Sequence, residues 1–265
     1  MKLHLRTTRL AAITILSLLA ISCGRSNRQR LALAYIIDMT ASVDSDAIQQ
    51  AFTALQPLLN SKILKRGDSI TIIPITGDTL TESQGKILRI HLPENREVYD
   101  SDLANLAKDV EEKLKRLQSE AIANPYQHSD ILGAADLAAE ELSTEKGNIR
   151  KVIVILSDFI QDDARFNFNT SPELSNDRTA VALAKKLSTN HKDEFGGTTL
   201  FLGMLRSKDL KKMPNARREA VQTFWREYFT SGGAQSVALA IDGPGKITSA
   251  VGRTEQILGF QTDPP

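Results

Sequence analysis

The sequence predicts an α/β fold with a single doubly wound, mostly parallel sheet and helices on both of its faces. Short apolar, β-branched runs alternate along the chain with longer segments whose apolar residues recur at helical spacing, as in strands joined by crossover helices. Several runs are apolar at every position, which indicates strands buried on both faces. The predicted strands are 31–37, 69–76, 86–92, 151–157, 199–205 and 236–241.

The segments between these runs predict amphipathic helices. Asp and Ser gather at their starts and Lys or Arg towards several of their ends, which suits helix capping and the helix dipole. The predicted helices are 43–60, 100–123, 130–144, 177–189 and 214–231. A turn-rich connection leads from the second strand to the third, so we expect these two to pair antiparallel, which makes one antiparallel edge strand.

Composition restricts both the number of domains and the kind of partner. The chain has 265 residues and a formal net charge of +1, with basic residues mostly interleaved with acids. Phosphate neutralisation needs a clustered basic surplus, so we do not expect a nucleic-acid binder. Since no Pro/Gly-rich linker divides the chain, we expect one domain over residues 31–250 and a tail over 251–265.

The first residues have the layout of a secretory signal. Basic residues precede the apolar stretch LAAITILSLLAIS, which ends at Cys23, the only cysteine of the chain. The motif LAISCG resembles the lipobox of bacterial lipoproteins, in which the cysteine is acylated. This resemblance implies a signal peptide over residues 1–22, lipidation of Cys23 and a polar tether over 23–30. It also implies a membrane-anchored protein of the cell envelope, on the outer membrane facing the periplasm in a diderm cell.

Polar side chains follow the first predicted strand abruptly. In LALAYIIDMTASVD, Asp38, Thr40 and Ser42 occupy alternate positions directly after an apolar run. In an open parallel sheet, ligands bind beyond the carboxyl ends of the strands. A turn immediately after the strand directs these three side chains into one crevice.

Two further segments bring the same chemistry to the same edge. Ser129 and Asp130 start a predicted helix, and Ser157 and Asp158 end a buried strand. Hydroxyl and carboxylate oxygens, without histidine or cysteine, suit Mg²⁺, or Mn²⁺ or Ca²⁺, rather than zinc. The sequence therefore predicts a metal site that consists of Asp38, Thr40, Ser42, Ser129 and Asp158.

These motifs, in this order, resemble the von Willebrand factor type A (vWA) family, whose metal-ion-dependent adhesion site (MIDAS) starts with Asp-x-Ser-x-Ser at a strand end. The resemblance extends from about Leu31 to about Ile241 and implies a Rossmann-like vWA fold. It implies that Thr40, Ser42 and Ser129 contact the ion. Asp38 and Asp158 would contact it directly or through water.

The resemblance also implies a function, which is binding of a protein partner whose Asp or Glu carboxylate completes the coordination of the ion. No enzyme is expected on this interpretation. The sequence departs from the family at Phe159, where the family usually has glycine after its last aspartate. This departure affects the following loop and hence ligand preference.

Three alternatives stay open at the level of sequence. The residues of the motifs are also common helix caps, so a fold without any ion is one of them. A second is a Mg²⁺-dependent phosphohydrolase resembling the haloacid dehalogenase family, with Asp38 as nucleophile and Ser157 at a second strand end. Thr40 stands where most such enzymes have a second acid. The third is a scaffold lipoprotein that needs no metal.

Overall fold

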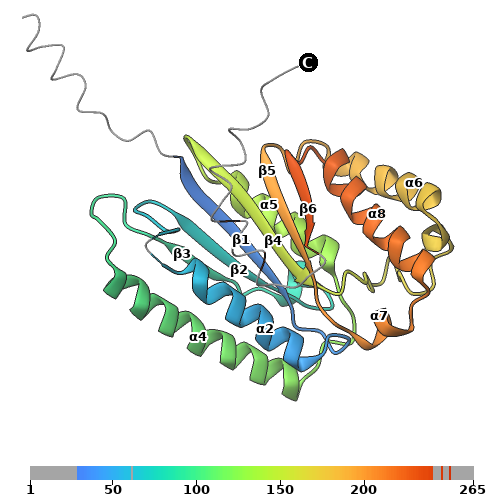
Figure 1. The fold of residues 1–265 in the computed structure, drawn as a ribbon, viewed down its shortest axis with the longest axis horizontal. Helices are drawn as coiled ribbons and strands as arrows, with labels where there is room; N and C mark the ends of the chain where they lie inside the picture. The colour runs from blue at the N-terminus through green and yellow to red at the C-terminus, as the bar shows by residue number, and fades with distance from the viewer. Residues whose placement is uncertain (1–28, 61, 241–245, 247–250, 252–265) are drawn as a thin grey trace, which may run out of the picture.

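The central sheet of the protein has the predicted architecture (Figure 1). The structure, a computed structural model, describes residues 29–60, 62–240, 246 and 251. Within them the sheet has six strands in the order β3-β2-β1-β4-β5-β6, and all neighbours pair parallel except β2 and β3. The strands are β1 (Arg30–Asp38), β2 (Ser69–Ile75), β3 (Leu88–His91), β4 (Ile149–Ser157), β5 (Thr198–Met204) and β6 (Ser236–Ala240). The α/β class and the antiparallel edge strand are confirmed.

Helices cover both faces of this sheet. The two described on one face, α2 (Ser45–Leu55) and α4 (Asp100–Ala123), lie side by side in Figure 1. The other face packs against α5 (Ile131–Ser143), α6 (Asp177–Ser188) and α8 (Asn215–Ser231). All five were predicted. The short elements were not predicted: α3 (Thr79–Glu82), α7 (Lys208–Lys212) and the 3-10 turns η1 (Gln56–Leu58), η2 (Pro172–Ser175) and η3 (Thr189–His191).

Alternate side chains of β1 pack against the helix layers on opposite faces of the sheet, which accounts for its continuous apolar pattern. Leu33, Tyr35 and Ile37 pack with the α2 and α4 layer, whereas Ala32 and Ala34 pack with the α5 layer. All of these side chains are buried, because a central parallel strand is covered on both faces. The aromatic residues of α8 also lie in the core, where Trp225 is only 1% exposed.

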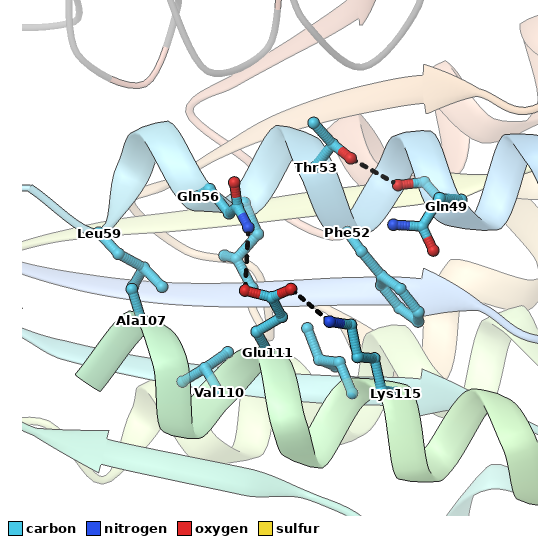
Figure 2. Close-up of a pocket in the computed structure, with 11 residues that line it drawn as sticks. Gln49, Phe52, Thr53, Gln56, Leu59, Ala107, Val110, Glu111 and Lys115 are labelled. Atoms are coloured by element: carbon cyan, nitrogen blue, oxygen red, sulfur yellow. Dashed lines mark hydrogen bonds and ion pairs between the residues drawn. The ribbon is translucent and has the colours of Figure 1, made fainter. Parts of the chain in front are cut away.

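A shallow groove between α2 and α4 is a packing seam rather than a binding site (Figure 2). Its volume is about 30 Å³. Gln56 Nε2 donates across the groove to the Glu111 carboxylate at 3.4 Å, and the same carboxylate pairs along α4 with Lys115 Nζ at 2.6 Å. None of the residues that line it belongs to the predicted metal site.

Several predictions concern residues that the structure does not describe. The signal peptide, Cys23 and all but the last residues of the tether fall within 1–28, and the expected tail is described only at Val251. Val251 is fully buried in the core layer of α2 and α4. Among the helices of the described ranges, none has the length and apolar character needed to span a bilayer.

Candidate metal centre

The predicted residues meet at the carboxyl ends of the central strands. Asp38 is the last residue of β1, and Asp158 follows the last residue of β4. These strands are neighbours, with Ile37 opposite Leu156. Ser129 precedes α5, where its backbone N–H donates to Asp162 O at 2.8 Å and its carbonyl accepts from Asp162 N at 3.0 Å. The α5 entry is thereby tied to the chain that follows Asp158.

Three hydroxyl groups form a connected cluster around Thr40. Thr40 Oγ1 donates to Asp38 Oδ1 at 2.6 Å and accepts from Ser129 Oγ at 2.8 Å. It also lies 3.1 Å from Ser42 Oγ. Asp38 and Thr40 are buried, as is Ser129, while Ser42 is half-buried. The structure therefore joins the hydroxyls of two distant segments in one hydrogen-bonded chain that ends at the Asp38 carboxylate.

Backbone hydrogen bonds hold the loop between β1 and α2 in this shape. Thr40 N donates to Asp38 Oδ1 at 3.0 Å, which turns the chain immediately after the strand. Ala41 N donates to Tyr126 O at 2.9 Å, and Val43 N to Thr40 O at 3.2 Å. These bonds fix the side chains of Thr40 and Ser42 on the same side of the loop as Asp38.

The two carboxyl groups of the site are buried and interact unfavourably. Burial raises the pKa of Asp38, against hydrogen bonds from Ser157 and Thr40 that lower it. Burial, followed by the negative charge of Asp38, raises the pKa of Asp158 to about 7. The Ile160 N–H, which donates to Oδ1, and the nearby Ser207 and Ser42 hydroxyls oppose this rise in the pKa of Asp158. Such a pair is expensive without a compensating positive charge.

One oxygen of this pair has no partner. Asp158 is fully buried, its Oδ1 accepts from Ile160 N at 3.0 Å, and its Oδ2 accepts no hydrogen bond from any group that the structure describes. Buried polar atoms are paired in the great majority of cases, so an orphaned carboxylate oxygen calls for a specific cause.

Phe159 adopts the backbone conformation for which glycine is the usual choice. Its φ is +60°, which is costly for a bulky side chain. The ring is only 2% exposed and packs edge-on against Trp225, with ring centroids 5.9 Å apart. Trp225 Nε1 also donates to Phe159 O at 2.9 Å. The aromatic core thus holds in place the loop that carries Asp158.

Asp130, which the sequence placed next to Ser129, organises the surroundings. Its carboxylate accepts from Gly133 N at 2.9 Å, as the N-cap of α5, and from Thr79 N at 3.2 Å. Arg165 pairs with the same carboxylate at 3.2 Å. Gln161 Oε1 caps the next free N–H groups of α5, those of Ile131 and Leu132. The start of α5, the start of α3 and the loop after β4 are therefore linked beside the hydroxyl cluster.

Sequence reasoning missed Ser207. It lies in the loop after β5, it is fully buried, and its hydroxyl lowers the pKa of Asp158. Its Oγ also accepts from Leu210 N at 3.0 Å and so caps α7. The only signal in the sequence is that Ser207 stands two residues after the apolar run 199–205, at the end of a predicted strand.

An apolar hollow lies beside the hydroxyl cluster. It has a volume of about 250 Å³, and Thr40 contributes to its wall. Ile122 is 69% exposed at its rim. The remaining lining comes from the β1–α2 loop, α2 and the end of α4: Met39, Ala41, Val43, Ser45, Ile48, Gln118, Ala121 and Pro125.

Comparisons with known proteins give structural neighbours but no sequence relative. No protein-family model and no curated protein matches the chain. Among solved structures, an aerotolerance-related membrane protein from Bacteroides fragilis is 14% identical, with a TM-score of 0.45 over 86% of this chain and 99% of that one. The pilus adhesin SpaC from Lactobacillus rhamnosus GG is 8% identical, with a TM-score of 0.46 over 88% of this chain and 30% of that one. Manganese-loaded TRAP from Plasmodium vivax is 12% identical, with a TM-score of 0.37 over 76% of this chain and 74% of that one.

Proposed function

We propose that this chain is a vWA-type interaction domain that binds a protein partner through a divalent metal ion. The ion is held by Asp38, Thr40, Ser42, Ser129 and Asp158, and a carboxylate of the partner completes its coordination. Cys23 carries the lipid that anchors the protein to the cell envelope, on the outer membrane facing the periplasm in a diderm cell. The domain is an interaction module rather than an enzyme.

The orphaned oxygen of Asp158 is the observation that carries this proposal. Two buried carboxyl groups lie together with Oδ2 of Asp158 unpartnered, and three hydroxyl oxygens are gathered on the same side. A purely structural cluster of helix caps would leave neither a like-charge pair nor an open carboxylate oxygen in the interior. A divalent cation satisfies both, because it supplies positive charge and accepts oxygen lone pairs.

The spacing of the hydroxyl oxygens fits a small ion. Neighbouring oxygens on an octahedral Mg²⁺ ion, at bond lengths of 2.0–2.1 Å, lie about 2.9 Å apart. Thr40 Oγ1 lies 3.1 Å from Ser42 Oγ and 2.8 Å from Ser129 Oγ. Five side chains and one partner carboxylate make up the six donors of an octahedral ion. We therefore propose Mg²⁺ or Mn²⁺ as the ion.

A protein carboxylate is the partner group that this donor set favours. The residues offer two carboxylates and otherwise neutral hydroxyls, so a bound divalent ion keeps an affinity for a further anionic oxygen. The apolar hollow beside Thr40, with Ile122 at its rim, offers surface for an aliphatic side chain next to the acid. A protein segment provides both groups.

The phosphohydrolase alternative has no specific support. A nucleophilic aspartate must present an oxygen to its substrate. Both oxygens of Asp38 accept hydrogen bonds, Oδ1 from Thr40 and Oδ2 from Ser157 at 2.6 Å each, and the side chain is fully buried. Asp38 is therefore oriented for support of the cluster rather than for attack.

The test is titration calorimetry of Mg²⁺ and Mn²⁺ into the full chain, with wild type, Asp38→Ala and Asp46→Ala compared. Asp46 is an exposed acid in the first turn of α2 and serves as the matched control. We expect saturable binding in wild type and in Asp46→Ala, and none in Asp38→Ala that is folded by circular dichroism. Equal binding in all three proteins would overturn the site.

The partner is tested separately. In envelope membranes, cross-linking to a partner should require Mg²⁺, disappear with chelator and fail with Asp38→Ala. Cross-linking that persists in chelator would favour the metal-independent scaffold. Release of phosphate from a small ester that stops with Asp38→Asn would favour the enzyme.

A further inference from the structure

A second group of metal-binding side chains lies outside the proposed site. Asp136 is in the middle of α5, and His191 and Glu194 lie in and after η3. One ligand atom from each of these three residues lies within 4.8 Å of the other two. His191 Nδ1 is 3.5 Å from Asp136 Oδ1 and 2.5 Å from Glu194 Oε2. The group shares no residue with the cluster around Thr40.

The environment of this group is partly closed and negatively charged. Exposed fractions of the side chains are 19% for Asp136, 30% for His191 and 30% for Glu194. A neutral imidazole can donate through Nδ1 to only one acceptor, so two neighbouring carboxylates are not both compensated by it. Their shared negative charge attracts a cation.

Neighbouring groups hold the ligands in position. Tyr228 Oη donates to Asp136 Oδ1 at 3.3 Å, and a carboxylate oxygen has a second lone pair with which it can bind an ion. Glu194 N donates to His191 O at 3.1 Å, and Phe195 N to Gly232 O at 3.0 Å, so the turn is attached to the end of α8. Such outer contacts orient metal ligands in proteins.

We propose that Asp136, His191 and Glu194 form a second metal site, selective for Zn²⁺ or a similar transition-metal ion. One imidazole nitrogen with two carboxylates suits zinc, whereas Mg²⁺ prefers oxygen alone. Two ligand atoms on a tetrahedral zinc ion lie about 3.4 Å apart. The Asp136–His191 distance already meets this value. The Glu194–His191 distance has to lengthen by about 1 Å, which rotation of the partly exposed Glu194 side chain allows.

A metal ion at this site would link parts of the fold that also support the proposed adhesion site. Asp136 belongs to α5, which starts beside Ser129 and Asp130. Tyr228 packs against Trp225 in the aromatic core that supports Phe159. Zinc would join α5 to the η3 turn and leave its remaining coordination position to water. The site would stabilise the layer behind the proposed adhesion site without taking part in it.

The experiment is Zn²⁺ titration of the full chain in excess Mg²⁺, with calorimetry and the visible absorption of Co²⁺ as independent measurements. The protein carries no histidine tag and is prepared as Cys23→Ser, since that thiol is the only one in the chain and cysteine thiolate is a common zinc ligand. Excess Mg²⁺ occupies the oxygen site. Wild type here means this Cys23→Ser protein.

The variants are His191→Gln and Asp136→Asn, with His128→Gln as matched control. His128 lies 3.2 Å from Asp162 and is 63% exposed, so it forms a similar pair outside the group of three. We expect one Zn²⁺ per chain in wild type and in His128→Gln, and at least tenfold weaker binding in His191→Gln and Asp136→Asn. Tyr228→Phe should weaken binding about tenfold, because it removes only an outer contact.

Either of two results would overturn the proposal. One is the absence of stoichiometric Zn²⁺ binding in folded wild type, which would make the group an ion-pair cluster only. The other is unchanged binding in His191→Gln. If Asp136→Asn does not fold, Glu194→Gln on the turn replaces it. The outcome is independent of the proposed adhesion site, which is tested with Mg²⁺ and Asp38→Ala.

Discussion

The carboxyl groups of Asp38 and Asp158 lie buried together at the ends of adjacent strands, and the charge of Asp38 contributes to raising the pKa of Asp158 to about 7. In the absence of a cation this pair destabilises the fold, because burial and like charge both disfavour the ionised form. Functional sites often carry such a cost. Stability and metal binding should therefore respond in opposite directions when one of the two charges is removed.

Asp158→Asn should test this relationship directly. At pH 8 without metal, we expect the variant to unfold at the same or a higher temperature than wild type, since it loses a buried charge that nothing compensates. Mg²⁺ binding should be lost. Thermal unfolding followed by circular dichroism, with and without Mg²⁺, measures both effects. Asp46→Asn is the control, and a markedly lower metal-free unfolding temperature for folded Asp158→Asn would contradict the argument.

The same pair predicts the pH dependence of stability. The pKa of Asp158 is about 7 in the folded chain, against an ordinary value of 3.8 for an aspartic acid side chain. Between these values the folded state binds more protons than the unfolded state, so this carboxyl group makes the unfolding free energy fall as pH rises from about 4 to about 7. The difference in unfolding free energy between wild type and Asp158→Asn should change over that range and level off above it. Urea titrations without metal at several pH values measure it. A difference that is independent of pH would contradict the raised pKa.

Phe159 should contribute to stability in two opposing ways, through burial of its ring and through its left-handed backbone, and a pair of variants can separate them. Removal of a buried ring costs about 3–5 kcal/mol, as for other buried Phe→Ala changes. The left-handed backbone costs about 1–2 kcal/mol for any side chain with a Cβ and little for glycine. We therefore expect both Phe159→Ala and Phe159→Gly to be destabilised, with the glycine variant more stable than the alanine variant by about 1 kcal/mol. Urea unfolding measures this difference, and an alanine variant at least as stable as the glycine variant would show that the conformation carries no strain.

The effect of Gly133→Ala on stability should depend on the Asp130 carboxylate, which caps α5. A Cβ at this position would lie 2.1 Å from Asp130 Oδ2, so Gly133→Ala has to displace the cap of α5. We expect a loss of about 1–3 kcal/mol in unfolding free energy. In an Asp130→Ala background the same change should be neutral or stabilising by up to about 1 kcal/mol, because alanine is the better helix former. A double-mutant cycle by urea unfolding measures the coupling, and additive effects would contradict it.

The sequence was sufficient to predict the layers of the fold. Apolar runs such as 31–37 and 152–156 are buried on both faces, and helical periodicity is strong in long segments such as 100–123. Both patterns are local, since each depends on the spacing of neighbouring side chains. The short helices α3 and α7 escaped prediction because four or five residues contain too little periodicity to recognise.

The sequence by itself determined which oxygen donors stand at the strand ends, because a strand that ends at Asp38 or just before Asp158 must deliver that residue to the sheet edge. Only the tertiary structure decided the pKa and the hydrogen bonding of these donors. The raised pKa and the orphaned oxygen of Asp158 arise from burial beside a residue far away in the sequence. The left-handed φ of Phe159 depends on packing against Trp225. Likewise, the grouping of Asp136 with His191 and Glu194 has no spacing signal, since it arises where two separate segments pack together.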